Sequence, residues 1–419
     1  LACAALALLL ALAWQFLVVR FNYGGNWTGL FCIGDRFPAP PSRAPQGLYR
    51  FSRSLGYDGQ FYLLVAHDPL LRADLQQYVD NPPLRWRRIL VPGLAYVAAG
   101  ARPQFIPAAY VGVVLAAVFG GAWWLSRFLG RAGCNAFWGL GFLLVPSVAV
   151  SLDRMTVDGA LAALSVAFAL YACEGEDRRG PLSTAGAGDS ACRYPWKIYP
   201  VLLLAPLARE TGLSLVLAFC LLSLACGKRK QAALGAAMGL PWVAWALFVR
   251  VRLWPDGTPW IGTLPLAGLL RRTFHPVQFQ ITGAWTAVAA ALDYAALLGV
   301  WFALFIAGRF AWQLGRGAAG QRSPLVRAGR SGEGAGPALL RVATVVFAAG
   351  VAFVGKPDVW AEAYAFARTM SPLLVWPALL GLATRSCWRL GPLALTIPRI
   401  AFQVATVSLP VLRGLLGLR

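Results

Sequence analysis

The densest group of reactive side chains lies in the run Gly56-Tyr57-Asp58-Gly59-Gln60-Phe61-Tyr62. Asp58 stands between a tyrosine and a glycine inside an aromatic run, where a loop is expected to meet a membrane. A carboxylate in such a place is a candidate for acid–base chemistry. Two structural interpretations compete with this one: Asp58 caps a helix that starts near Gly59, and the aromatic residues form a belt at the membrane surface.

A basic motif follows in the run Asp80-Asn81-Pro82-Pro83-Leu84-Arg85-Trp86-Arg87-Arg88-Ile89-Leu90-Val91-Pro92. The Asn-Pro-Pro interrupts the chain before the basic stretch. Arg85 and Arg88 are three residues apart, so they share a helical face. Two guanidinium groups on one face suit a phosphate, which they grip through bidentate hydrogen bonds. The competing interpretation is that these arginines anchor lipid headgroups.

Further charged residues stand at the ends of apolar runs. Asp158 begins an apolar helix, and a carboxylate at that depth is costly enough to indicate a function. The alternative is a surface pair of Asp153 with Arg154, with Asp158 as a charge at a helix N-terminus. Arg209 and Glu210 are adjacent and do not face each other on a helix, so each is expected to meet a partner on another element.

The chain lacks the motifs of several other reaction classes. Its only histidines are His67 and His275, and it has neither the nucleophile elbow of a hydrolase nor a glycine-rich phosphate loop. ATP-driven transport by this chain alone is therefore not expected. A last charged run, from Lys356 to Arg368, precedes an apolar segment.

The elements that must position these residues are apolar. Of the 419 residues, 58% are hydrophobic and 13% are charged, whereas a soluble domain has roughly 45–50% and about 25%. This composition excludes an ordinary cytosolic enzyme. The formal net charge is +21, but the basic residues gather in short loops between apolar runs. That distribution follows the positive-inside rule rather than a nucleic-acid-binding surface, so we expect membrane lipids and no nucleic acid around the protein.

The predicted fold is an all-α polytopic integral membrane protein, one membrane domain over residues 1–419. About eleven transmembrane helices are expected, from the apolar ranges 1–19, 105–126, 135–150, 156–173, 198–208, 211–226, 232–250, 284–308, 338–355, 371–384 and 390–410. The first is expected to span rather than to be a removed signal peptide. Residues 20–104 form a long first extracytoplasmic loop with interfacial helices, and residues 174–197 and 309–337 are predicted cytoplasmic linkers.

The distribution of basic residues among the loops predicts how the protein is oriented in the membrane. If eleven segments alternate, the basic loops share one face, which is then cytoplasmic. These loops hold Arg127, Arg131, Lys228 to Lys230, Arg309 to Arg330, Arg385 and Arg389. Most acidic residues fall at or near the opposite face, so chemistry done with carboxylates is expected outside.

Together these motifs resemble known proteins. A first helix, a long outer loop with an early acidic residue, and a multi-helix bundle resemble bacterial membrane glycosyltransferases of the GT-C fold class. More narrowly, residues 56–62 and 80–92 resemble a family linked to cell-surface glycopolymer formation, which carries YDGQFY and then DNP…R..RIL.P. Ala208 to Gly212 and Ala367 to Pro372 look like further elements of it. The resemblance covers residues 1–385 in order, and Trp86-Arg87 departs from the pattern.

This resemblance implies an enzyme, a glycosyltransferase that takes a sugar from a polyprenyl-phosphate donor and passes it to a glycan or lipid acceptor of the cell envelope. It also implies a bacterial inner (plasma) membrane, with the active site facing the periplasm or exterior. The leaving phosphate is stable as an anion, so one carboxylate acting as base on the acceptor hydroxyl suffices, and cations stabilise the departing phosphate. Glycoside hydrolysis, by contrast, needs two carboxylates.

The expected roles of single residues follow from that chemistry. Asp58 is the expected general base, and the donor phosphate is expected to bind Arg85, Arg88 and Arg209. The expected substrate-binding residues are Tyr57, Gln60, Tyr62, Asp158, Glu210 and Arg368, with the two tyrosines stacking on a sugar ring. No cofactor is required, although a divalent metal near Asp58 and Asp158 is compatible with the arrangement.

Two other functions stay open at this point. A transporter or flippase of lipid-linked sugars predicts inverted repeats and charges near mid-membrane, whereas the sequence shows no repeat and its charges are expected at the outer rim. A non-catalytic scaffold of an envelope assembly predicts that Asp58 is dispensable.

Overall fold

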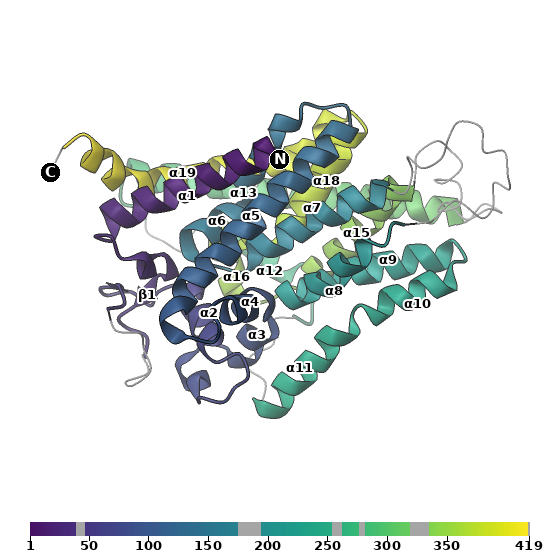
Figure 1. The fold of residues 1–419 in the computed structure, drawn as a ribbon. Helices are drawn as coiled ribbons and strands as arrows, with labels where there is room; N and C mark the ends of the chain where they lie inside the picture. Colours follow the sequence, from purple (N-terminus) through teal and green to yellow (C-terminus); the bar gives the residue numbers. More distant parts are fainter. Residues whose placement is uncertain (39–46, 175–193, 254–261, 276–280, 319–334, 418–419) are drawn as a thin grey trace.

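The computed structural model describes residues 1–38, 47–174, 194–253, 262–275, 281–318 and 335–417, and Figure 1 traces its fold. Within these ranges the chain is almost entirely helical. The two strands among them, β1 (Ile33–Gly34) and β2 (Arg50–Phe51), are short and pair in parallel. The predicted all-α class is therefore confirmed.

The helices of the first half are α1 (Ala2–Asn22), α2 (Asp58–His67), α3 (Pro82–Arg87), α4 (Leu90–Ala98), α5 (Ile106–Arg131), α6 (Pro146–Arg154), α7 (Asp158–Glu174), α8 (Ile198–Ala208) and α9 (Leu213–Ala225). Those of the second half are α10 (Arg229–Ala237), α11 (Leu240–Arg252), α12 (Ala267–Phe274), α13 (Ala284–Ala318), α15 (Ala335–Ala352), α16 (Pro357–Trp360), α17 (Ala363–Thr369), α18 (Ser371–Ala383) and α19 (Gly391–Leu415). Short 3-10 helices join several of them: η1 (Trp27–Phe31), η2 (Leu75–Tyr78), η3 (Pro103–Phe105), η4 (Ala136–Leu144), η5 (Glu210–Gly212) and η6 (Cys387–Leu390).

Among the described residues, five helical stretches are long and apolar enough to cross a membrane: Ala2–Asn22, Pro103–Arg131, Arg229–Arg252, Ala284–Gly315 and Cys387–Leu415. Two bent pairs raise the number to seven if each pair forms one span. These are Ala136–Leu144 with Pro146–Arg154, bent by 60°, and Ala363–Thr369 with Ser371–Ala383, bent by 61°. The chain is thus an all-α protein with five to seven candidate membrane spans.

This number differs from the predicted eleven, although each predicted apolar range falls largely on helix. The ranges 198–208 and 211–226 form α8 and α9, of 11 and 13 residues, whereas a straight span needs about 20. The two helices are separate because Arg209, which follows α8, has an extended backbone (φ −161°, ψ 142°). The hydropathy pattern places a break between these two ranges, but the count of eleven treats each short helix as a span of its own.

The predicted first outer loop is a folded unit, and Figure 1 shows α2, α3 and α4 gathered at one end of the long helices. A small apolar core forms around Phe61, Val65 and Trp86. The indole nitrogen of Trp86 donates to the Asp68 carbonyl (2.9 Å), and the Trp86 carbonyl accepts a hydrogen bond from Trp245 (2.7 Å). Trp86 therefore ties this loop to α11.

Helix α7 runs through the middle of the bundle, and nearly all of its residues are buried. Its last residue, Glu174, forms ion pairs with Arg127 (3.1 Å), Arg131 (3.2 Å) and Lys197 (3.8 Å). Its first residue, Asp158, lies 16 residues away along the helix, about 24 Å at 1.5 Å per residue. Basic residues that share the predicted cytoplasmic face thus meet at one end of α7, and the candidate site lies at the other.

The two predicted cytoplasmic linkers lie mainly outside the described residues, because positions 175–193 and 319–334 are not among them.

Candidate functional site

Asp58 is placed by glycines on either side of it. Gly56 has a φ of +78°, in the left-handed region that favours glycine. A Cβ atom at Gly59 would lie 2.3 Å from the carbonyl oxygen of Arg154, so the start of α2 packs directly on the end of α6. Asp58 is the first residue of α2, but its carboxylate is held by arginines rather than by helix amides. The structure therefore gives no support to the capping interpretation.

Each carboxylate oxygen of Asp58 binds one guanidinium group. Arg85 Nη2 donates to Oδ1 and Arg368 Nη2 donates to Oδ2, both at 2.8 Å. Burial raises the pKa of Asp58, but the charges of Arg85 and Arg368 lower it more, so the pKa lies well below its usual range. Asp58 is therefore an anion wherever these two arginines stay in place.

Arg85 and Arg88 are positioned by a capped helix. Asn81 is the N-cap of α3 and its side chain accepts a hydrogen bond from the Leu84 amide (3.2 Å). Both guanidinium groups then donate to the hydroxyl of Tyr62, Arg85 at 3.3 Å and Arg88 at 2.9 Å. The two side chains are only 4% and 1% exposed, so they are not placed to anchor lipid headgroups.

Each of these arginines also has a bidentate carboxylate partner. Arg85 donates to both oxygens of Asp80 (2.9 and 2.7 Å), and Arg88 donates to both oxygens of Glu210 (2.9 and 2.6 Å). Such fork-shaped pairs fix the direction of the guanidinium plane as well as its position.

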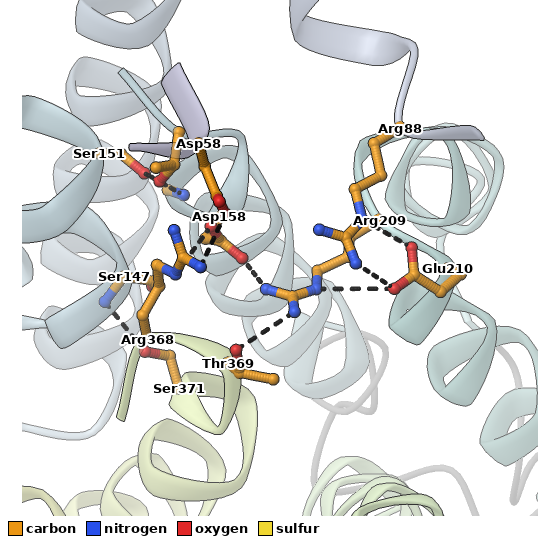
Figure 2. Close-up of polar contacts among 12 residues, drawn as sticks. Asp58, Arg88, Ser147, Ser151, Asp158, Arg209, Glu210, Arg368, Thr369 and Ser371 are labelled. Atoms are coloured by element: carbon orange, nitrogen blue, oxygen red, sulfur yellow. Dashed lines mark hydrogen bonds and ion pairs between the residues drawn. The ribbon is translucent and has the colours of Figure 1, made fainter. Parts of the chain in front are cut away.

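Asp158 joins the site to the second half of the chain, as Figure 2 shows. It forms an ion pair with Arg209, whose Nη2 also donates to Thr369 (3.2 Å). The other oxygen of Asp158 lies 3.5 Å from Arg368 Nε. As predicted, the adjacent residues Arg209 and Glu210 have their main partners on other elements.

These contacts close into a ring in which carboxylates alternate with arginines except at Tyr62, which joins Arg88 to Arg85, and the members come from five separate stretches of the chain. In order around the ring they are Asp58, Arg368, Asp158, Arg209, Glu210, Arg88, Tyr62 and Arg85, with Asp80 attached to Arg85. The weakest link is the 3.9 Å contact between Arg209 and Glu210. Four buried arginines balance four carboxylates, so the ring carries no net charge.

Two serines hold the elements that carry this ring. The Ser151 hydroxyl of α6 accepts a hydrogen bond from the Gly159 amide (2.8 Å) at the start of α7. The Ser371 hydroxyl of α18 accepts one from the Ser147 amide (3.0 Å) at the start of α6. Helix α6 is therefore bonded to the start of α7, which carries Asp158, and to the start of α18, which lies just after Arg368 in the sequence (Figure 2).

A cavity of about 390 Å³ opens beside Asp58, a volume suited to a small ligand. Its charged and aromatic wall residues are Tyr57, Asp58, Asp80, Arg85, Lys356, Glu362 and Arg368. Another cavity, of about 440 Å³, lies between α5, α7 and α18, but no charged side chain lines it. The charged cavity is therefore the candidate site.

The structure divides the predicted site residues into two groups. Asp58, Arg85, Tyr57 and Arg368 line the charged cavity, and the guanidinium of Arg368 lies 5.2 Å from the ring centre of Tyr57. The residues that lie behind the wall, outside its lining, are Arg88, Arg209, Gln60, Tyr62, Asp158 and Glu210.

Two of the residues behind the wall have evident structural roles. Tyr62 is fully buried, and its hydroxyl accepts two arginine hydrogen bonds, so its ring is not available to stack on a sugar. Gln60 accepts from the Gly34 amide (3.1 Å) and donates to the Leu55 carbonyl (2.7 Å). Its side chain thus fixes the loop that precedes α2 rather than a substrate.

Sequence reasoning assigned no role to three charged residues of the cavity wall, Asp80, Lys356 and Glu362. Asp80 stands inside the basic motif, five residues before Arg85, and this proximity in sequence could have indicated that the two side chains form an ion pair. Lys356 and Glu362 belong to the charged run before residue 371, and nothing in their spacing links them to Asp58.

A metal ion finds no ready ligand set in the part of the chain that the structure describes, where no three His, Cys, Asp or Glu side chains form a group. Both oxygens of Asp58 hold an arginine nitrogen. A divalent cation near Asp58 and Asp158 would have to displace Arg368.

Comparisons of this chain with family models, with curated proteins and with solved structures found no match.

Proposed function

We propose that the chain is a membrane glycosyltransferase, which transfers a sugar from a polyprenyl-phosphate-linked donor to a hydroxyl of a cell-envelope glycan or lipid. The proposal includes a GT-C-like bundle in a bacterial plasma membrane, with the cavity beside Asp58 on the extracytoplasmic side. The observation that carries it is the pair of buried guanidinium groups, Arg85 and Arg368, on the wall of that cavity.

Arg368 offers the best contact for a phosphate. Its Nη2 is held by Asp58, whereas its Nη1 is buried and donates no hydrogen bond to any residue that the structure describes. A buried donor without an acceptor is costly, and a phosphate oxygen would satisfy it. Lys356 adds a second positive charge to the same wall.

The proposed reaction needs little from the protein beyond charge and position. The acceptor oxygen forms a bond to the anomeric carbon while the bond from that carbon to the phosphate oxygen breaks. The acceptor proton passes to a carboxylate, and the polyprenyl phosphate leaves as an anion. Guanidinium groups that are already fixed stabilise the developing charge without reorganising.

The test uses the full-length protein in lipid nanodiscs with Arg368→Gln. Undecaprenyl phosphate binding is measured directly, and transfer is followed with undecaprenyl-phosphate sugars labelled in the sugar. We expect weaker binding and a loss of roughly 10²- to 10³-fold in transfer, the usual effect of removing one fixed donor. Arg127→Gln is the matched control and should change neither, because Arg127 lies on α5 and contacts Glu174 at the end of α7 that is remote from the cavity.

Two outcomes contradict this proposal. One is a wild-type protein that binds undecaprenyl phosphate no better than the Arg368→Gln variant does. The other is movement of the labelled lipid across a liposome membrane without any transfer of the sugar, which is the behaviour of a transporter.

A further inference from the structure

Glu362 occupies an unusual position at the edge of the charged cavity. It is the N-cap of α17, and its backbone carbonyl accepts hydrogen bonds from the amides of Ala365 and Phe366, both at 3.0 Å. An N-cap side chain normally binds one of the first helix amides, but the carboxylate of Glu362 makes no such bond. It lies on the cavity wall with Asp58 and Arg368.

The carboxylate of Glu362 has no hydrogen bond or ion pair with the residues that the structure describes. Its charged surroundings are Arg368 on its own helix, Arg154 on α6, Asp293 on α13 and Arg399 on α19, together with Lys356 on the cavity wall. Burial raises the pKa of Glu362, and the nearby arginines only partly offset this effect.

The position of Glu362 is nevertheless fixed. The amide of Ala363, the next residue, donates to Asp293 Oδ1 (3.2 Å), and that oxygen also accepts from Arg399 Nε (2.8 Å). Asp293 and Arg399 are buried. The start of α17 is therefore held against two long helices, and the Glu362 side chain is left to face the cavity.

Asp58 has the opposite properties. Both of its oxygens are occupied, and its pKa lies well below the usual range. A general base works best when its pKa is close to the operating pH, so a carboxylate stabilised this strongly as an anion is a weak proton acceptor.

We propose that Glu362 is the base that receives the proton of the acceptor hydroxyl, and that Asp58 is a positioning residue for Arg85 and Arg368. This inference rests on the proposed transferase function. In the step, the acceptor O–H bond breaks toward Glu362, the oxygen bonds to the anomeric carbon, and the electron pair of the broken carbon–oxygen bond leaves on the phosphate. Glu362 ends the step protonated and returns its proton to water.

The experiment compares Glu362→Gln with wild type, using the full chain in nanodiscs. We expect transfer to fall by roughly 10²- to 10⁴-fold, the usual contribution of a general base, while undecaprenyl phosphate binding is unchanged. The wild-type rate should rise with pH as Glu362 loses its proton, and this acid limb should be missing from the residual rate of the variant. Asp74→Asn, an exposed acid away from the cavity, is the control and should keep both rate and pH profile.

Different results contradict the two proposals. Transfer by Glu362→Gln at the wild-type rate, with the acid limb intact, overturns the role of Glu362 alone. A folded wild-type protein that does not bind undecaprenyl phosphate overturns the transferase function itself. If Glu362→Gln does not fold, Glu362→Asp decides the matter, because its shorter side chain should slow transfer at least tenfold and an unchanged rate overturns the role.

Discussion

Asp58 joins two arginines that stand 27 and 310 residues away in the sequence, and it lies half-buried at the cavity wall between them. We expect Asp58→Asn to abolish transfer and to lower the free energy of unfolding by about 3 kcal/mol, because it removes one of the two carboxylate partners of Arg85 and of Arg368, both of which are buried. Thermal unfolding in detergent and the transfer assay measure the two effects.

Asp80→Asn is the matched control for that variant. Asp80 is about a third exposed and shares Arg85 with Asp58, so its loss should cost about 1 kcal/mol or less. Equal destabilisation by the two variants would contradict the central place of Asp58 in the ring.

His67, the last residue of α2, makes stability depend on pH. Burial lowers its pKa to about 4, and its Nε2 has no hydrogen-bond partner among the described residues. The unfolded chain takes up a proton near pH 6.5, while the folded protein stays neutral until about pH 4. Stability should therefore be lost as the pH falls from about 6.5 to about 4.

Replacing His67 with phenylalanine should flatten that loss, because a ring of similar size no longer titrates. The measurement is the unfolding temperature of both proteins at pH 7, 6 and 5. Asp58 does not contribute in this window, since its lowered pKa keeps it ionised there. An equally steep fall in the variant would show that other groups cause it.

At the scale of elements, the contact between α2 and α6 determines where Asp58 lies. A methyl group at Gly59 would meet the Arg154 carbonyl oxygen at 2.3 Å, so Gly59→Ala must push α2 away from α6. We expect a loss of transfer of at least tenfold, measured in nanodiscs. Gly112→Ala in α5 is the control, because nothing lies within 4 Å of its added carbon, and it should stabilise the helix by up to about 1 kcal/mol. Normal transfer by Gly59→Ala would show that α2 has room to shift.

The sequence predicted the helical class and the apolar ranges, because these depend on composition and local spacing. It could not show which arginines reach the cavity. Arg85 and Arg88 share one motif and one partner, Tyr62, yet only Arg85 lines the cavity wall. That difference is set by Glu210, which draws Arg88 away, and a contact across 122 residues leaves no local pattern.

Tyr62 illustrates the same limit in the other direction. An aromatic residue beside a candidate acid suggests a sugar platform, but one helical turn after Asp58 this ring points into the bundle and is fully buried. The sequence gives the type of each side chain, and local spacing gives its place on a helix. Only the packing of distant helices decides whether that place faces a cavity.

At the scale of the whole molecule, α7 separates two charged ends. The ring around Asp158 lies at its start, and Glu174 with its basic partners lies at its end. The proposed orientation is tested with single cysteines in a background that lacks the eight native ones. A membrane-impermeant maleimide added to intact cells should label Asp74→Cys and not Arg229→Cys, both of which replace exposed residues. Permeabilised cells should label both, and the reverse pattern in intact cells would invert the topology.

The closed ring also has a consequence for biosynthesis. Arg368, which completes it, is made long after Asp58, Arg85 and Arg209, so a chain still on the ribosome holds most of the parts but not the finished assembly. Under the proposed function, a nascent chain cannot bind the donor phosphate at the completed site until α17 has been made, and a product that ends before α17 is expected to be inactive even if its first helices insert.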